Sequence, residues 1–172
     1  MVGGEMAVEQ KLMEKAGAIL QEKGHVAVEL AKQRVLRDQA EYAPFRDALR
    51  YFIGGWNDVL HPALVWLACE AVGGKPQTTD KVGAALVLLA GGADIHDDVI
   101  DESLTKASKQ TVFGKFGKDV AILAGDTLLL EGIYLLHEAC ENLEVTKKKK
   151  ILDLANRAFL EISGAEAAEA SM

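Results

Sequence analysis

The apolar residues of this chain recur three and four positions apart almost from end to end. No stretch shows sustained period-two alternation rich in β-branched side chains, so the pattern predicts helices. The expected helices, which are separated by glycine, proline or short polar segments, cover residues 8–23, 25–41, 45–53, 62–72, 80–103, 118–142 and 145–170. Helices of this length with short connections predict a bundle, and we expect one all-α domain over residues 1–172.

Several residues mark where these helices should begin and end. Gly24 is a candidate C-cap between the first two helices. Pro62 suits the first turn of the fourth helix, and residues 78–80 (Thr-Thr-Asp) offer N-caps for the long fifth helix. Residues 104–110 are mostly polar, and we expect them to form a connection without regular structure.

The bulk composition narrows the class of protein. The chain has 172 residues, of which 49% are hydrophobic and 26% are charged, as in a globular domain with a sizeable core. Its net charge of -7 argues against general binding to nucleic acid or to an anionic membrane, which needs a basic surface. An anionic substrate would therefore need a cation supplied locally, either a metal ion or a basic cluster.

Cysteine usage and the N-terminal segment bear on the compartment. Cys69 and Cys140 lie in apolar helical stretches, and we expect both to be buried, reduced thiols without a disulfide or zinc framework. Residues 1–15 carry charges throughout, which does not fit a signal peptide. The apolar run over residues 82–93 is too short for a membrane span and ends in acid. We therefore expect a cytoplasmic location.

Four aspartates fall at helical spacing i, i+3, i+4 and i+7 near the end of the fifth helix, and this spacing places them on one helix face. They are Asp94, Asp97, Asp98 and Asp101. Like charges one turn apart repel, and the helix C-terminus disfavours negative charge, so a cation should compensate. Carboxylate oxygens without a histidine or cysteine cluster suit Mg²⁺. The plain alternative is a solvated acidic helix end paired with lysines such as Lys106 and Lys109.

The flanking sequence favours the magnesium interpretation. Residues 96–103 (His-Asp-Asp-Val-Ile-Asp-Glu-Ser) resemble the first aspartate-rich motif, DDxxD, of trans-polyprenyl diphosphate synthases. Residues 111–117 resemble the family segment P-T-V-x-x-x-F-G, with Gln110 where proline is usual. Residues 121–129 resemble the family helix A-x-L-A-G-D-x-L-L, and the resemblance extends over about residues 54–166.

The resemblance implies a fold, a reaction and site residues. The fold would be an all-α bundle of the isoprenoid synthase type, here truncated relative to the family. The reaction joins an allylic diphosphate to isopentenyl diphosphate, and Mg²⁺ stabilises the leaving diphosphate. By resemblance, Asp97 and Asp101 would bind Mg²⁺ directly and Asp98 would support the site, so these three are the expected catalytic and metal residues. Lys106 would contact the diphosphate.

The resemblance also bears on product length. In the family, the residues four and five positions before DDxxD help to form the floor of the product tunnel, and here they are Ala93 and Gly92. Small side chains there would leave room for a product longer than about twenty carbons. An alternative is that the glycines simply permit close helix packing.

The departures from the family pattern carry as much information as the matches. The second aspartate-rich motif and a lysine-threonine pair would lie beyond residue 172, so the chain resembles the N-terminal half of a family member. The basic motif G-K-R-x-R-P would fall at residues 55–62, where His61 alone could act as a cation. A family histidine is Ala90 here, and an arginine pair is Lys106-Ala107. A truncated chain would explain the missing half but not the changed basic motif.

These observations lead to a functional hypothesis. We expect a subunit of a heteromeric long-chain polyprenyl diphosphate synthase that is inactive alone and whose partner supplies the second motif and the isopentenyl site. Membrane contact would be at most peripheral, through the lipid product. Alternatives are a non-catalytic regulatory or structural partner of an active subunit, an enzyme resembling class I terpene synthases, and a metal-binding bundle unrelated to prenyl chemistry.

Other polar residues have simpler explanations. We expect His96 to pack or hydrogen-bond locally, and Asp126 to reach Lys115 or a substrate-side cation. Residues 147–150, four lysines, are expected on a solvent-facing helix, with contact to an acidic partner as the alternative. The helix over residues 118–142 is apolar nearly all round, so it is buried or lies at an interface, and the corresponding family helix forms the dimer interface.

Overall fold

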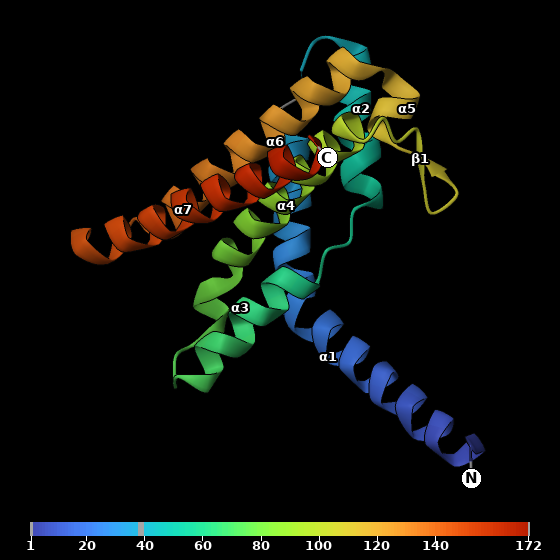
Figure 1. The fold of residues 1–172 in the computed structure, drawn as a ribbon. Coiled ribbons are helices and arrows are strands. Elements are labelled where there is room, and N and C mark those ends of the chain that lie inside the picture. Colours follow the sequence, from blue (N-terminus) through green and yellow to red (C-terminus); the bar gives the residue numbers. More distant parts are fainter. Residues whose placement is uncertain (1, 38–39, 172) are drawn as a thin grey trace.

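The computed structural model describes residues 2–37 and 40–171, with side chains from residue 9 onward (Figure 1). The α-helices are α1 (Val2–Arg37), α2 (Ala43–Gly55), α3 (Leu60–Ala71), α4 (Asp80–Ile100), α5 (Val112–Phe116), α6 (Lys118–Ala139) and α7 (Val145–Glu169). A 3-10 helix, η1 (Pro76–Thr79), precedes α4, and two short strands, β1 (Thr105–Lys106) and β2 (Lys109–Gln110), follow it. The expected all-α helical bundle is confirmed.

Helices α4 and α6 form the centre of the bundle, and α1 and α3 pack on α4 (Figure 1). Glycines let the two central helices approach closely. A Cβ atom at Gly132 of α6 would lie 2.7 Å from Leu89 Cγ of α4, so any larger residue there would push the helices apart. Leu88, Ile95 and Leu128 fill the core between them and are fully buried.

The first two expected helices are one helix. Gly24 lies inside α1 rather than at a C-cap, and the prediction of a helix end there was wrong. A Cβ atom at Gly24 would meet the carbonyl oxygen of Val59 and would lie 3.0 Å from Val59 Cα. The glycine therefore serves close packing of α1 against the chain before α3, and tertiary contact overrides its low helix propensity. The expected range 25–41 also includes residues 38–39, which lie outside the described residues.

The starts of α4 and α3 are stabilised by other groups than the sequence suggested. The hydroxyls of Thr78 and Thr79 donate to the carbonyl oxygens of Lys75 and Pro76, at 2.7 Å and 2.6 Å, and so stabilise η1 instead of capping α4. Helix α3 begins at Leu60, two residues before Pro62. Its start is held by the Asp58 carboxylate, which accepts from the backbone N–H groups of the first two residues of α3.

The segment between α4 and α5 has regular structure that the sequence pattern did not predict. β1 and β2 form an antiparallel hairpin in which Thr105 pairs with Gln110 and Lys106 with Lys109. The two turn residues, Ala107 and Ser108, have φ values of 49° and 65°, in the left-handed region that favours glycine. This hairpin replaces the irregular connection expected over residues 104–110.

Helix α7 and one side of α6 are less covered than the centre of the bundle. No residue of α7 is buried, and α6 exposes several apolar side chains, among them Leu123 and Leu130. Helix α6 is also the one described helix that is long and apolar enough to cross a membrane. Length and composition alone do not show a membrane span, because the core helix of a soluble protein meets the same criterion.

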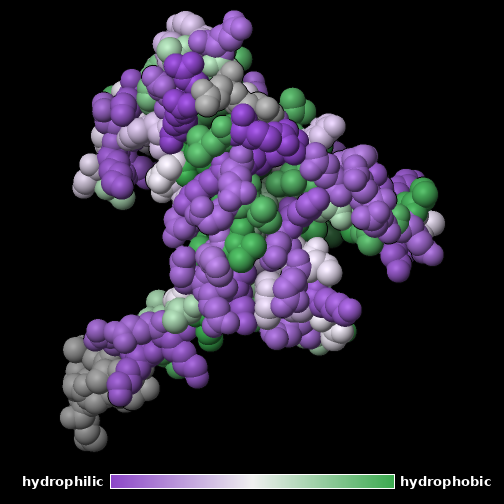
Figure 2. Space-filling model, turned by 180° about the vertical axis from the view of Figure 1, so that it is seen from behind, coloured by the Kyte–Doolittle hydropathy of each residue, from purple (hydrophilic) through white to green (hydrophobic). Residues whose placement is uncertain are grey.

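The surface of the molecule is mostly hydrophilic where α1 leaves the bundle. Residues 9–19 are exposed, and Figure 2 shows this part of the helix projecting from the body.

Cys140 is buried as expected, whereas Cys69 is only half-buried, and both are free thiols. The prediction of two buried thiols is therefore correct for one of them.

Candidate functional site

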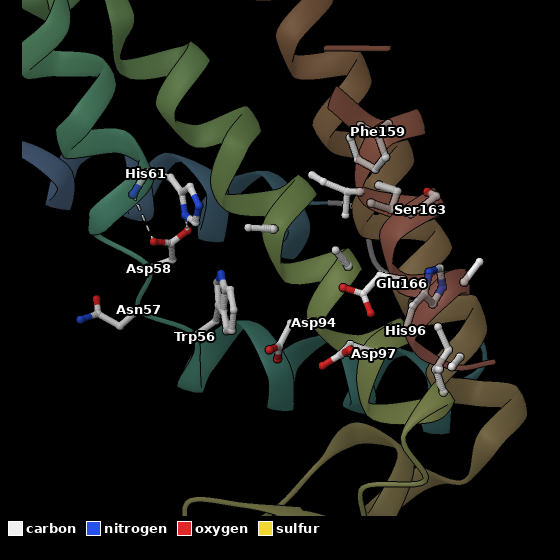
Figure 3. Close-up of a pocket in the computed structure, with 17 residues that line it drawn as sticks. Trp56, Asn57, Asp58, His61, Asp94, His96, Asp97, Phe159, Ser163 and Glu166 are labelled. Carbon is white, nitrogen blue, oxygen red and sulfur yellow. Dashed lines mark hydrogen bonds and ion pairs between the residues drawn. The ribbon is translucent and has the colours of Figure 1, made fainter. Parts of the chain in front are cut away.

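A cavity of about 960 Å³ lies between α4, α7 and the segment that leads into α3 (Figure 3). Its walls are mostly apolar, and its carboxylates come from three elements. They are Asp58 before α3, Asp94 and Asp97 on α4, and Glu166 on α7. Of the described residues that line the cavity, none is a lysine or an arginine.

The structure divides the four aspartates that the sequence placed on one helix face. Asp94 and Asp97 line the cavity, Asp98 is buried with 5% exposure, and Asp101 follows the last residue of α4 and is exposed. At about 100° of rotation per residue, the four directions span an arc of roughly 100° around the helix. Such an arc is wide enough to meet the cavity, the hairpin and solvent at once, so a common face does not mean a common environment.

The ammonium group of Lys106 lies between two of these aspartates. Lys106 Nζ is 2.6 Å from Asp94 Oδ1 and 3.6 Å from Asp98 Oδ1. Burial raises the pKa of Asp98, and the neighbouring Lys106 opposes part of that rise. The hydrogen bond to Asp94 raises the pKa of Lys106, so the lysine keeps its charge. Lys109, the other lysine considered from the sequence, has no ion pair with these aspartates among the described contacts.

His96 fixes the end of α4 against α6. Its Nε2 atom lies 3.2 Å from the carbonyl oxygen of Ile122 and 3.3 Å from Asp126 Oδ1. The expectation of a local hydrogen bond is confirmed. Asp126 does not reach Lys115, whose Nζ lies 3.9 Å from the centre of the Tyr51 ring. His96 is also part of the cavity wall, so the α4–α6 contact and the site share one side chain.

The two small residues predicted at the tunnel floor have different positions. Ala93 lines the cavity. Gly92 is buried between α4 and α6, and a Cβ atom there would lie 2.8 Å from Leu129 Cγ and 2.9 Å from the Gly125 carbonyl oxygen. Close helix packing therefore explains Gly92, and only Ala93 is placed to affect what fills the cavity.

The segment that corresponds to the family's basic motif has a different chemistry here. The Trp56 indole N–H donates to the Val87 carbonyl oxygen at 3.2 Å. The Trp56 ring stacks on the Phe52 ring. Asp58 and His61 form a pair with 2.6 Å between Oδ2 and Nδ1, drawn as a dashed line in Figure 3. The only candidate cation of this segment is therefore already paired with a carboxylate.

Helix α7 contributes residues that the sequence reasoning missed. Phe159 and Ile162 add apolar wall, and Glu166 projects from α7 toward the α4 residues Asp94 and Asp97 (Figure 3). The half-buried positions of α7 are 148, 151, 152, 155, 159 and 166, but Lys148 and Glu166 interrupt any apolar stripe, so the sequence pattern did not mark this inner face. Nothing in the spacing alone shows that this face looks into a cavity.

The donor set suits a magnesium ion that arrives with a phosphate ligand. Within residues 9–37 and 40–171, no three histidine, cysteine, aspartate or glutamate side chains converge to hold a metal ion by themselves. Mg²⁺ commonly uses only one or two carboxylates and completes its shell with water and substrate phosphate. Cavity-facing Asp97, with exposed Asp101 one turn later, offers hard oxygen ligands of this kind.

Comparison with known proteins agrees with the fold and the motifs. A geranylgeranyl diphosphate synthase of Methanosarcina mazei is 33% identical over 115 residues, which are 67% of this chain and 35% of the relative. The large subunit 1 of a chloroplastic heterodimeric geranylgeranyl pyrophosphate synthase from Arabidopsis thaliana is 36% identical over 85 residues, 48% of this chain and 23% of that one.

Solved structures show the same fold over most of the chain. The crystal structure of geranylgeranyl pyrophosphate synthetase from Pyrococcus horikoshii aligns with a TM-score of 0.80 and 26% identity, and the alignment covers 90% of this chain and 46% of that one. The chain thus spans about a third of the curated Methanosarcina relative and about half of this solved structure. A family model described as Polyprenyl synthetase matches residues 43–171, and the chain therefore belongs to the polyprenyl synthetase family.

Proposed function

We propose that this chain is a subunit of a heteromeric long-chain polyprenyl diphosphate synthase and contributes the magnesium-dependent site for the allylic diphosphate. One observation carries the proposal: Asp94 and Asp97 of α4 line a large, mostly apolar cavity. An allylic diphosphate has the same division, with a charged head and a hydrocarbon tail. The proposal adds that the chain turns over no substrate without a partner.

Each group at the site has a role in this proposal. Asp97 and Asp101 would hold Mg²⁺, which when bound stabilises the charge of the departing diphosphate. Lys106 would donate to a phosphate oxygen, and Asp98 would keep Lys106 near the site through their 3.6 Å contact. Leu129 and Phe159 give the tail an apolar wall that excludes water, and Ala93 leaves room for a product longer than about twenty carbons.

Three observations support the need for a partner. The segment before α3 pairs His61 with Asp58, which leaves no free cation there for a second diphosphate. On α6, Leu123, Leu130 and Tyr134 are each more than half exposed, which is an apolar surface of the kind that subunits bury. One relative is itself described as the large subunit of a heterodimer.

A second candidate function is a non-catalytic partner that shapes an active synthase. The Lys106–Asp94 ion pair favours it, because it neutralises the lysine that would otherwise attract a diphosphate. The two candidates make opposite predictions for aspartate variants in the assembled complex.

The deciding experiment is purification of the chain with its associated proteins from its source, followed by assay with isopentenyl diphosphate and allylic diphosphates. We expect no turnover by the chain alone and turnover by the complex. Asp97→Asn and Asp101→Asn should each abolish turnover by the complex. Full activity of these variants would establish the non-catalytic role, and turnover by the isolated chain would contradict the heteromeric proposal.

A further inference from the structure

Asp94 forms an ion pair with Lys106, which among the described contacts is the lysine that lies beside the α4 aspartates. The 2.6 Å distance of this pair is that of a charge-assisted hydrogen bond. Asp94 is not part of the DDxxD motif, which begins at Asp97. The side chain of Asp94 is 23% exposed and lines the cavity, so the pair lies at the cavity edge.

The hairpin that carries Lys106 is held firmly in this position. Its ends are joined by the hydrogen bond from Thr111 N to the Leu104 carbonyl oxygen, at 3.0 Å, and Thr111 Oγ1 donates to the Ser103 carbonyl oxygen at 2.7 Å. Its turn has positive φ values at both central residues, Ala107 and Ser108, as two-residue hairpin turns commonly do, and this turn sets the pairing of Lys106 with Lys109. Although its side chain is 55% exposed, Lys106 is therefore held beside Asp94 by the hairpin and by their ion pair.

The other charged side chains around the cavity decide how the Asp94–Lys106 pair affects diphosphate binding. Asp58, Asp97 and Glu166 also line the cavity, and no lysine or arginine does so within the described part of the chain. While Asp94 neutralises Lys106, an incoming diphosphate meets carboxylates without a free cation. A metal ion at Asp97 would reverse the local sign, and Lys106 has three N–H donors, so it can bind phosphate without leaving Asp94.

We propose that Asp94 is a positioning residue that makes diphosphate binding dependent on the metal ion, by neutralising Lys106 until metal arrives. The inference rests on the proposed function of the site and deepens it, since it assigns a role to a residue outside the metal ligands. Without the Asp94 charge, Lys106 is free to attract a diphosphate on its own. The order of binding then no longer requires the metal.

The test measures binding of inorganic pyrophosphate to the full chain by calorimetry, with and without Mg²⁺. The wild type should bind pyrophosphate only with Mg²⁺. Asp94→Asn should bind it without metal, with an affinity at least about tenfold above the detection limit that bounds metal-free binding by the wild type. The double variant Asp94→Asn/Lys106→Gln should lose this gain, and Asp94→Glu should behave as the wild type.

Glu166→Gln is the matched control, because it removes one cavity carboxylate that has no ion pair with Lys106 among the described contacts. It should not produce metal-free binding. An equal gain in Glu166→Gln would overturn the inference, since general repulsion rather than release of Lys106 would then explain the effect. No gain in Asp94→Asn would also overturn it.

A second measurement does not depend on pyrophosphate. Acylation of lysines, followed by mass spectrometry, should show Lys106 reacting more slowly than Lys109, its cross-strand neighbour, and Asp94→Asn should remove the difference. Equal reactivity in the wild type would refute the inference whatever the binding data show. If the wild type fails to bind magnesium pyrophosphate while Asp94→Asn binds pyrophosphate without metal, the proposed function and the metal dependence both fail, and only the neutralisation of Lys106 by Asp94 stands.

Discussion

The ring of His96 on α4 lies directly over Gly125 on α6. A Cβ atom at Gly125 would be 2.5 Å from both the Cδ2 and Nε2 atoms of that ring. Because His96 hydrogen-bonds to α6 through Nε2 and also lines the cavity, this glycine joins the packing of the two central helices to the geometry of the candidate site.

Gly125→Ala should therefore displace the His96 ring and destabilise the chain. Overpacking of a buried contact typically lowers the free energy of unfolding by about 1–3 kcal/mol. The measurement is urea unfolding followed by circular dichroism. Gly164→Ala is the control, because a Cβ atom at Gly164 meets nothing within 4 Å and should leave stability unchanged or raise it by about 0.5–1 kcal/mol. Similar effects at both glycines would contradict the packing argument.

Arg34 joins α1 to α6 through two carboxylates. Its Nε donates to Glu131 at 2.6 Å and its Nη1 to Glu138 at 3.0 Å, and the Arg34 side chain is 11% exposed. Arg34→Met should lower the free energy of unfolding by about 2 kcal/mol, a value reduced from that of a fully buried pair because both glutamates are partly exposed. Exposed Arg157→Met is the control and should change it by less than about 0.5 kcal/mol.

Larger side chains at the neighbouring residues Gly92 and Ala93 should change different properties, namely stability at Gly92 and product length at Ala93. Gly92→Ala should destabilise the chain by about 1–3 kcal/mol, because its Cβ would lie 2.8 Å from Leu129 Cγ. Ala93→Phe should fill part of the cavity instead and shorten the product of the assembled complex, as measured by chromatography of the dephosphorylated product. An unchanged product length would count against the role proposed for Ala93.

Cys140 should be much less reactive than Cys69. Cys140 has 0% exposure, and burial raises the pKa of its thiol, whereas Cys69 is half-buried. Since the thiolate is the reacting form, alkylation of Cys140 at pH 8 should be slow and should speed up as the pH rises. Mass spectrometry after iodoacetamide treatment gives both rates in one sample. Equal rates in the folded chain would show that the end of α6 opens readily, and denaturant should abolish the difference.

The sequence pattern predicted the helical class and most helix positions, because apolar periodicity directly reports which side of a helix faces the core. It failed where a local signal met a tertiary contact. Gly24 has the properties of a C-cap, but α1 continues through it because the glycine allows the chain at Val59 to approach. Ala107 and Ser108 have no sequence signature of a hairpin turn, so the strands beside them could not be expected.

For the candidate site too, the sequence predicted the residue types and their spacing, whereas tertiary packing decided what surrounds each side chain. The spacing of Asp94, Asp97, Asp98 and Asp101, with the motifs that follow, was enough to indicate the family. Helical spacing fixes only the directions of these side chains around their own helix. What each one meets depends on α7, on the hairpin and on the segment before α3, which are distant in sequence.

By itself, the sequence determined the helical bundle, the aspartate motif and the altered basic segment, because each of these depends on residue type and local spacing. Only the tertiary structure decided that Asp97 faces an apolar cavity, that Gly92 packs against α6, and that Lys106 is bound by Asp94. The physical reason is that burial and ion pairing depend on distances between segments, and those distances exist only once the helices have packed.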